Sequence, residues 1–324
     1  MRRHLNEVQA RGGHRSSDHG HRGLSRWLGA GTVVVGDQNL YAFDTRDGSP
    51  RWTFTDATLP GALYLGSDDS TVYAGAYLGS SGELFAIRFS DGSLRWKTVV
   101  VPDSIVATGE SIRLYGPVYS AGVVFVSFNW QRLDIKKNVG GIAAVDASTG
   151  ALLWSRVLPR PSPEKSTLPE NPAVSRDVVA VSVLDGNVYA LNRTDGSIRW
   201  TVPPVVLPDG SSPFQDMRIV GAGADIVAAS GQGILMAFAA VDGRKLWQMD
   251  PRFGAAVGHI TIDGSAVFSH YIVGQLASMD VSTGRINWRF DAAHEPNVGF
   301  LEARLAGDTL YATGLGGLWA FRAR

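Results

Sequence analysis

A two-part phrase recurs along this chain and constrains its fold more than any other feature. Residues 40–52 show it most clearly, as LYAFDTRDGSPRW: an apolar-x-Ala-apolar half, then a Gly-x-x-x-Trp half. Seven copies of the first half have their small residue at Ala42, Ala86, Ala144, Ala190, Ala237, Ser278 and Ala320. Six copies continue into the second half, at Gly48 and Trp52, Gly92 and Trp96, Gly150 and Trp154, Gly196 and Trp200, Gly243 and Trp247, and Gly284 and Trp288. Copies spaced 41 to 58 residues apart predict one supersecondary unit per repeat, with each core completed by stacking against neighbouring units.

Each unit reads as four short strands. Within residues 60–98 these are ALYLGSD, STVYAGAYL, ELFAIRFS and SLRWKTV, and the middle two alternate small or polar with β-branched or aromatic residues. Asp-Gly or Thr-Gly turns, which suit a tight hairpin with a positive φ, separate the third strand from the fourth. Four-stranded antiparallel units at this spacing predict an all-β fold, a seven-bladed β-propeller with residues 23–324 as its single domain. We expect the repeat glycines and tryptophans to pack neighbouring blades together.

One more Gly-x-x-x-Trp phrase, from Gly23 to Trp27, bears on how the ring closes. It forms either the outer strand of the last blade, which leaves three strands for the first, or the innermost strand of the first blade, which leaves the last blade one strand short. The first arrangement would tie the two ends of the chain together and remove an open sheet edge, so we favour it.

Charge and composition narrow the classes of function. The 30 basic and 30 acidic residues of this 324-residue chain cancel, whereas a protein that mainly binds nucleic acid needs a basic surface. No apolar run approaches the roughly 18 residues of a membrane-spanning helix. The chain has no cysteine, which excludes disulfides, cysteine-bound zinc and a lipid-modified cysteine. Residues 1–22 are basic and rich in Gly, Ser and His, so we expect a disordered tail and no secretory signal peptide; the compartment stays open.

The phrase stands nearly whole at residues 143–154 (AAVDASTGALLW) and 277–288 (ASMDVSTGRINW), where it resembles the pyrroloquinoline quinone (PQQ) repeat. The resemblance covers residues 23–324. It is similar to the non-enzymatic PQQ-like propellers, such as the propeller lipoprotein of the bacterial outer-membrane barrel assembly machinery, and it implies a binding scaffold in a bacterial cell envelope. In this family the repeat marks blade packing rather than cofactor binding.

The resemblance also extends to the PQQ-dependent dehydrogenases, which share the repeat. Those enzymes use a vicinal disulfide and a calcium site at the cofactor. This chain has no cysteine and shows no matching set of calcium ligands. We therefore expect no quinone, no other cofactor and no metal.

Four insertions lengthen the loops on one face of the predicted propeller, beside blades three to five: residues 99–115, 129–140, 157–172 and 203–216. Connections between blades and second-to-third-strand loops share this face, and the short glycine turns lie on the other. Elaborated loops on a rigid scaffold are where binding usually occurs, so we predict a protein or peptide partner here. Aromatic and basic side chains typical of interfaces supply the candidate contacts. These are Tyr115, Trp130, Arg132, Lys136 and Phe214.

Two of the insertions also have plainer interpretations. Residues 129–140 mix Trp130 with basic side chains, but they also fit an extended hairpin with a solvated tip. Residues 157–172 contain five prolines and fit either a docking strip or a stiff connector.

Catalytic and metal chemistry have little support in the sequence. His259, His270 and His294 are residues of a type that binds zinc or exchanges protons, but their spacing matches no local metal motif, and scattered loop histidines explain them more simply. The chain also lacks a phosphate-binding glycine loop, a His-Glu-x-x-His helix and a Gly-x-Ser-x-Gly elbow. We predict a monomeric, non-catalytic protein-binding scaffold. The alternative is an enzyme or small-ligand sensor that uses the mouth of the central channel, which an apolar concave pocket would favour.

Overall fold

The fold is described from a computed structural model of the chain. The residues described are 26–29, 31–36, 38–59, 63–76, 82–101, 111–132, 137–160, 166–183, 186–203, 219–231, 234–249, 257–263, 266–271, 275–291, 300–306, 309–314 and 317–322. The tail predicted at residues 1–22 lies outside these ranges.

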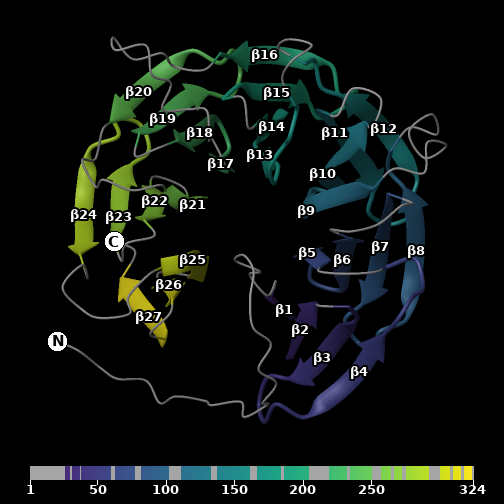
Figure 1. Cartoon of the computed structure of the whole chain (residues 1–324). Helices are drawn as coiled ribbons and strands as arrows, with labels where there is room; N and C mark the ends of the chain where they lie inside the picture. The colour runs from purple at the N-terminus through teal and green to yellow at the C-terminus, as the bar shows by residue number, and fades with distance from the viewer. Residues whose placement is uncertain are drawn as a thin grey trace.

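Seven antiparallel sheets form a ring, and the chain visits them in order (Figure 1). The first sheet consists of β1 (Arg26–Gly29), β2 (Thr32–Gly36), β3 (Leu40–Asp44) and β4 (Pro50–Phe54). The second consists of β5 (Leu63–Ser67), β6 (Thr71–Ala76), β7 (Glu83–Arg88) and β8 (Leu94–Val99). The third consists of β9 (Ile112–Ser120), β10 (Val123–Arg132), β11 (Lys137–Asp146) and β12 (Leu152–Val157). The fourth consists of β13 (Ala173–Val174), β14 (Val178–Ser182), β15 (Val188–Asn192) and β16 (Ile198–Val202).

The remaining three sheets complete the ring. The fifth consists of β17 (Ile219–Ala222), β18 (Ile226–Gly231), β19 (Ile234–Ala239) and β20 (Lys245–Met249). The sixth consists of β21 (Val257–Asp263), β22 (Ala266–Tyr271), β23 (Gln275–Asp280) and β24 (Ile286–Asp291). The seventh consists of β25 (Phe300–Ala306), β26 (Thr309–Gly314) and β27 (Gly317–Arg322). Strand order within each sheet follows the chain from the centre of the ring to its rim, which confirms the predicted seven-bladed all-β propeller.

The ring closes differently from the arrangement that the sequence favoured. β1 pairs with β2, with Trp27 opposite Val34, so the phrase ending at Trp27 supplies the innermost strand of the first sheet. Gly29 pairs with Thr32 across a tight turn in which Gly31 has a φ of 73°. A hairpin this local costs less chain entropy than pairing with a strand at the far end of the chain, which explains the difference. Within the described residues, the last sheet has three strands.

Each repeat tryptophan lies opposite the small residue of its own sheet. Strand pairing sets Ala42 opposite Trp52, Ala86 opposite Trp96, Ala144 opposite Trp154, Ala190 opposite Trp200, Ala237 opposite Trp247 and Ser278 opposite Trp288. These six small residues are at most 1% exposed. Their size lets the bulky indole lie close to the sheet and extend toward the next blade.

The indole packs on the glycine turn of the following blade. Trp52 contacts Gly92, Trp96 contacts Gly150, Trp154 contacts Gly196, Trp200 contacts Gly243 and Trp247 contacts Gly284. A Cβ at any of these five glycines would lie 2.5–2.7 Å from an indole atom. Each of the five indole nitrogens donates a hydrogen bond of 2.8–3.0 Å to the backbone carbonyl three residues before the glycine. The glycines therefore serve twice: they adopt φ values of 69–77° in the turn, and they leave room for the neighbouring tryptophan.

The sixth repeat tryptophan makes a different contact. Trp288 stacks on Phe321 of β27, with ring centroids 6.1 Å apart. Phe290 also approaches Phe321, at 5.0 Å. Aromatic packing therefore joins the sixth sheet to the last one. Among the described residues, the chain forms no helix that is long and apolar enough to cross a membrane.

Two of the glycine turns contain aspartates whose ionised form is stabilised by neighbouring hydroxyls. Hydrogen bonds from Ser148 and Thr149 lower the pKa of Asp146 to about 2. The pKa of Asp280 is lowered to about 2 in the same way, because its turn repeats the sequence. These folded-state pKa values lie below 3.8, the ordinary value. The ionised turns therefore stabilise the fold above roughly pH 4, and this stabilisation is lost as the pH falls toward 2.

We expect the urea midpoint of unfolding to fall between about pH 4 and pH 2. The double variant Asp146→Asn, Asp280→Asn keeps an acceptor oxygen at each turn but cannot titrate there. Its midpoint should fall less steeply over the same range. An equally steep fall in the variant would show that these two turns do not contribute to the acid sensitivity.

Candidate partner-binding face

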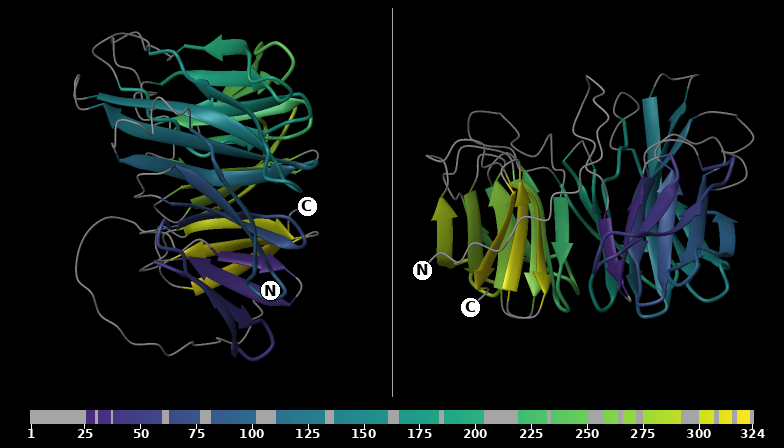
Figure 2. Two further views of the ribbon diagram at one scale, coloured as in Figure 1. Left: turned by 90° about the vertical axis from the view of Figure 1, so that its right-hand side faces the viewer. Right: turned by 90° about the horizontal axis from the view of Figure 1, so that it is seen from below.

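The third sheet extends beyond the others on the face that carries the insertions. β10 and β11 have 10 residues each and pair from Val123 opposite Asp146 to Arg132 opposite Lys137. The second and third strands of the other sheets have five or six residues. In side view the hairpin of β10 and β11 rises above the neighbouring strands (Figure 2). Its strands show that the insertion at 129–140 lengthens a hairpin, although the link at 133–136 lies outside the described residues.

Two of the predicted contact residues are buried in the third sheet, one in this hairpin and one on the adjacent strand β9. Trp130 is 6% exposed and stacks on Phe128, with ring centroids 6.2 Å apart. Tyr115 on β9 is 9% exposed, and its hydroxyl accepts a 2.8 Å hydrogen bond from the Asn129 amide. Its ring also lies 5.4 Å from that of Tyr64 in the second sheet. The sequence predicted both rings among the contacts to a partner, whereas in the structure they fasten the hairpin to β9 and to the adjacent blade.

The other three candidates have no described side chain. Arg132 is the last residue of β10 and pairs through its backbone with Lys137. Lys136 and Phe214 lie in stretches outside the described residues. The backbone pairing thus brings Arg132 and Lys137 together at the end of the hairpin, and Lys136 is adjacent to Lys137 in the chain.

The described part of the proline-rich insertion, residues 166–172, packs against the outer part of the hairpin, close to its tip. The Thr167 amide donates a 2.8 Å hydrogen bond to the Asn138 carbonyl, and the Asn138 amide donates a 3.1 Å bond back to this segment. Pro169 lies against Gly140, where a Cβ would come within 2.2 Å of the proline ring. These contacts make residues 166–172 a fixed connector between the third and fourth sheets. The glycine at position 140 is the sequence feature that permits this close approach. The composition of the insertion, which the sequence analysis used, does not predict it.

The histidines that the sequence singled out are only partly placed. His259 on β21 and His270 on β22 lie opposite each other in backbone register. Their side chains, and the whole of His294, lie outside the described residues. In the part of the chain that the structure describes, no group of three or more His, Cys, Asp or Glu side chains is positioned to hold a metal ion.

Two hollows lie on the face opposite the insertions, at seams between neighbouring sheets. One, of about 560 Å³ between the first and second sheets, is lined by Arg51, Arg88 and Arg95 together with Asp69. The other, of about 540 Å³ between the third and fourth sheets, is lined in a similar way by arginines and Asp177. Both lie at seams between blades and are lined by arginines, away from the mouth of the channel.

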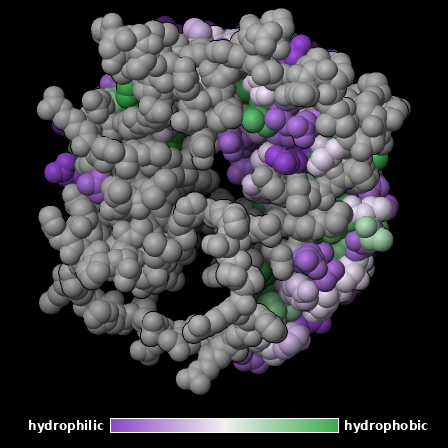
Figure 3. Space-filling model, in the orientation of Figure 1, coloured by the Kyte–Doolittle hydropathy of each residue, from purple (hydrophilic) through white to green (hydrophobic). Residues whose placement is uncertain are grey.

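The insertion-bearing face is polar where it is described. Figure 3 looks onto this face, and the residues over the sheets β5–β8 and β9–β12 are predominantly hydrophilic, with small apolar areas between them. A partner on this face would therefore rely on hydrogen bonds and charge as much as on apolar contact.

A family model matches nearly the whole chain in sequence, and known proteins match about two thirds to three quarters of it. A family model described as outer membrane protein assembly factor BamB matches residues 26–133, 107–212 and 185–324. A protein of Bordetella pertussis with that same name is 27% identical over 257 residues, which are 74% of this chain and 59% of that protein. The protein of this name from Yersinia pestis is 26% identical over 224 residues, 64% of this chain and 52% of its own length. The chain thus spans between one half and three fifths of the length of these two relatives.

Solved structures match the chain in fold. A crystal structure of BamB from Moraxella catarrhalis aligns with a TM-score of 0.50 and 16% identity, over 92% of this chain and 95% of that one. The computationally designed protein Ika8 aligns with a TM-score of 0.55 and 14% identity, over 94% and 97% of the two chains. At such identities these matches show the fold alone.

Proposed function

Because the chain belongs to the family described as outer membrane protein assembly factor BamB, whose PQQ-like repeats it carries, we propose that it is a non-catalytic binding scaffold of the bacterial cell envelope. The relatives from Bordetella pertussis and Yersinia pestis are named outer membrane protein assembly factors. We extend that role to this chain: it binds a protein partner during the assembly of outer membrane proteins.

The contact is proposed to lie on the insertion-bearing face, at the hairpin of β10 and β11. The observation that carries this proposal is that contacts within the chain order the described strands of the hairpin. Two buried aromatic rings, Trp130 and Tyr115, pack at its outer half, and Tyr115 bonds Asn129 of β10. Residues 166–172 support its outer part, close to the tip, and the Glu170 amide connects this support to the fourth sheet through a 3.0 Å hydrogen bond to the Ser182 carbonyl. A projecting element that is already ordered loses little conformational entropy on binding, which favours affinity.

The charge of the hairpin end indicates what the partner offers. Residues 132–137, RLDIKK, contain three basic side chains and one acid. We therefore expect an acidic surface on the partner. Complementary charge of this kind mainly raises the association rate and selects the partner.

The test reverses these charges rather than deleting the insertion, because deletion would also remove the buried Trp130 and destabilise the sheet. The test variant is Arg132→Glu, Lys136→Glu, Lys137→Glu. The control variant makes the same change in charge on exposed residues of the opposite face, Arg244→Glu, Lys245→Glu, Arg285→Glu. Each protein is used to capture partners from the solubilised envelope of the source organism, and bound proteins are quantified by mass spectrometry.

We expect the hairpin variant to lose at least about tenfold of its captured partner, a loss of roughly 1.4 kcal/mol or more in binding, and the control to lose none. Both variants should melt like the wild type. Equal capture by all three proteins would show that the partner does not use this hairpin. Equal loss in both variants would show a general charge effect instead of a site.

A further inference from the structure

The hollow between the first and second sheets carries an excess of positive charge. Its lining contains three guanidinium groups, those of Arg51, Arg88 and Arg95, and one carboxylate, that of Asp69. Arg51 reaches the hollow from β4, and the other two arginines reach it from β7 and β8. Its volume of about 560 Å³ is in the usual range of small-ligand sites. The charge of the lining favours an anionic ligand.

The first sheet shows how a carboxylate fits between such groups. Thr32 and Asp44 lie opposite each other in strand register. The Arg51 guanidinium donates a 2.7 Å hydrogen bond to the Thr32 hydroxyl and another of 2.7 Å to the Asp44 carboxylate. Arg46 donates a 2.9 Å hydrogen bond to the same carboxylate. The Asp44 side chain is 6% exposed, so this ion pair is an internal part of the first sheet.

The second sheet repeats this arrangement with one change. Thr71 lies opposite Arg88 in strand register, and the Arg95 guanidinium donates a 2.6 Å hydrogen bond to the Thr71 hydroxyl. Arg95 directly precedes a repeat tryptophan, as Arg51 does. Arg88 therefore occupies the position that Asp44 has in the first sheet. In the described part of the chain, neither Arg88 nor Arg95 forms an ion pair with a carboxylate.

This replacement is particular to the second sheet. In the other sheets that have four described strands, the same position holds Asp44, Asp146, Asn192, Ala239 and Asp280. The second sheet alone among these six sheets has a basic residue there. Its two arginines therefore lack the internal carboxylate that the first sheet supplies.

The acids nearest to these arginines have other hydrogen-bond partners or lie at the surface. Asp91 accepts a 2.8 Å hydrogen bond from the Ser93 amide, and Asp69 is exposed. Arg88 donates a 2.8 Å hydrogen bond to the Ser93 hydroxyl. A guanidinium group has five N–H donors. Arg88 and Arg95 thus keep donors that a ligand can use.

The hollow between the third and fourth sheets is of similar size, but two of its arginines already have partners. Arg193 donates hydrogen bonds of 2.9–3.2 Å to three backbone carbonyls. Arg176 lies 3.2 Å from the Asp225 carboxylate. The third arginine of that lining is Arg199, which also precedes a repeat tryptophan. That hollow therefore offers a ligand one arginine, whereas the hollow between the first two sheets offers a pair.

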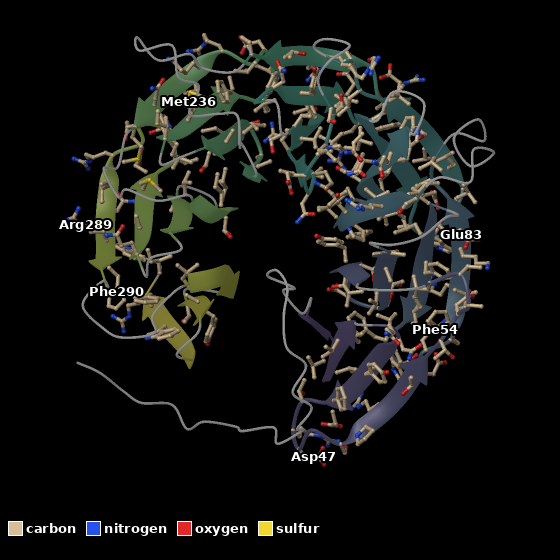
Figure 4. All side chains as sticks on the ribbon, in the orientation of Figure 1. Asp47, Phe54, Glu83, Met236, Arg289 and Phe290 are labelled. Carbon is tan, nitrogen blue, oxygen red and sulfur yellow. The ribbon has the colours of Figure 1, made fainter. Side chains whose placement is uncertain are left out.

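Packing of the first two sheets closes the seam beyond the hollow. Phe89, which lines the hollow, is 1% exposed, and its carbonyl accepts a 2.9 Å hydrogen bond from the Trp52 indole. Phe54 of β4 lies against Phe85 of β7, with ring centroids 6.2 Å apart. Figure 4 labels Phe54 where the two sheets meet. The two arginines of the second sheet are exposed, so the hollow is open to solvent on the face opposite the insertions.

We propose that this hollow binds a carboxylate of an acidic peptide segment, which Arg88 and Arg95 hold as the first sheet holds Asp44. A guanidinium group matches a carboxylate in shape and donates two parallel hydrogen bonds to it. Because both arginines are exposed, a free carboxylate would gain little from them, whereas a peptide adds contacts along its length. The hollow is separate from the hairpin of β10 and β11, so the inference does not depend on the function proposed above.

The test variant, Arg88→Asp, supplies the missing carboxylate from within the chain. It copies the first sheet, so the new carboxylate should pair with Arg95 and exclude the peptide. Its melting temperature should equal or exceed that of the wild type. A second variant, Arg88→Asn, removes the guanidinium without adding a carboxylate and takes the residue type of Asn192 in the fourth sheet. The control variant, Arg199→Asp, makes the same change in charge at an exposed residue of the other hollow.

The probe is an acetylated and amidated peptide, GSEEGS, that carries a neutral fluorophore, and the control peptide is GSQQGS. Fluorescence anisotropy measures binding to the full chain at low ionic strength, because salt screens exposed charges. Glutarate and inorganic phosphate serve as competitors. They distinguish a site for a peptide from a site for a free anion.

We expect the wild type and Arg199→Asp to bind GSEEGS equally and neither to bind GSQQGS. Arg88→Asp and Arg88→Asn should each weaken binding at least about tenfold. Glutarate and phosphate should displace the peptide only at concentrations at least about tenfold above its Kd.

Failure of the wild type to bind GSEEGS would overturn the proposal, as would happen if another part of this chain occupied the hollow. Equal binding of the two peptides, or equal binding by the wild type and both Arg88 variants, would also overturn it. Equal loss in Arg88→Asp and Arg199→Asp would show a general charge effect instead of a site. Displacement by phosphate or glutarate near the Kd of the peptide would assign the hollow to a free anion.

Discussion

Trp154→Ala is expected to lower the free energy of unfolding by about 3–5 kcal/mol, the usual cost of truncating a buried large aromatic side chain. Trp154 is 6% exposed, and its ring lies 6.1 Å from that of Phe125. Its indole nitrogen donates a 2.9 Å hydrogen bond to the Arg193 carbonyl in the fourth sheet. The substitution therefore opens a cavity between two blades and removes the donor from a backbone carbonyl. Urea unfolding followed by circular dichroism measures the loss.

Leu153 supplies the control for this variant. It precedes Trp154 on β12 but is 50% exposed. Leu153→Ala should change the free energy of unfolding by no more than about 0.5 kcal/mol, as is usual for surface positions. If Trp154→Ala unfolds within the same margin of the wild type, the account of blade packing by the repeat tryptophans is wrong.

The architecture could be predicted because the same sequence pattern recurs from blade to blade. The alternation of side chains, the glycine turn and the tryptophan each carry a weak signal, but seven copies of the first and six of the other two, all in register, leave one fold that satisfies them all. The way the ring closes depends on a single segment of the chain, so no repeated pattern could predict it. By sequence pattern, the strand with Trp27 could belong to the first sheet or to the last. In the structure the short turn at Gly31 pairs it with β2 of the first sheet.

The candidate face could be located from the sequence, but its individual residues could not. Insertions mark a face by topology alone, since the long segments all fall in one class of loop. Whether Trp130 projects or packs depends on whether the strand continues through the insertion, and that depends on pairing with β11. Two signals were readable: the alternation of residues 123–132, which continues past the length of other strands, and the Gly140–Gly141 pair, which marks a close approach.

The second purpose of the turn glycines yields the last prediction: Gly196→Ala should destabilise the protein more than Gly48→Ala. The two glycines have nearly equal φ values of 70° and 73°. An alanine at positive φ costs about 1–2 kcal/mol at either site. At Gly196 a Cβ would also lie 2.5 Å from the Trp154 ring, whereas at Gly48 it meets no atom of the described residues within 4 Å. Overpacking adds about 1–3 kcal/mol, so we expect a total near 2–5 kcal/mol at Gly196.

A double-mutant cycle isolates the contact between the turn and the indole. In a Trp154→Ala background the ring that opposes the new Cβ is gone, so Gly196→Ala should cost only the conformational part and the displacement of the Arg156 side chain, whose Cγ would lie 2.8 Å from that Cβ. The difference between the two backgrounds, about 1–3 kcal/mol, is the coupling between residues in direct contact. If Gly196→Ala lowers the free energy of unfolding equally in both backgrounds, Gly196 is needed only for the backbone conformation of the turn. The repeat would then join glycine and tryptophan for separate reasons.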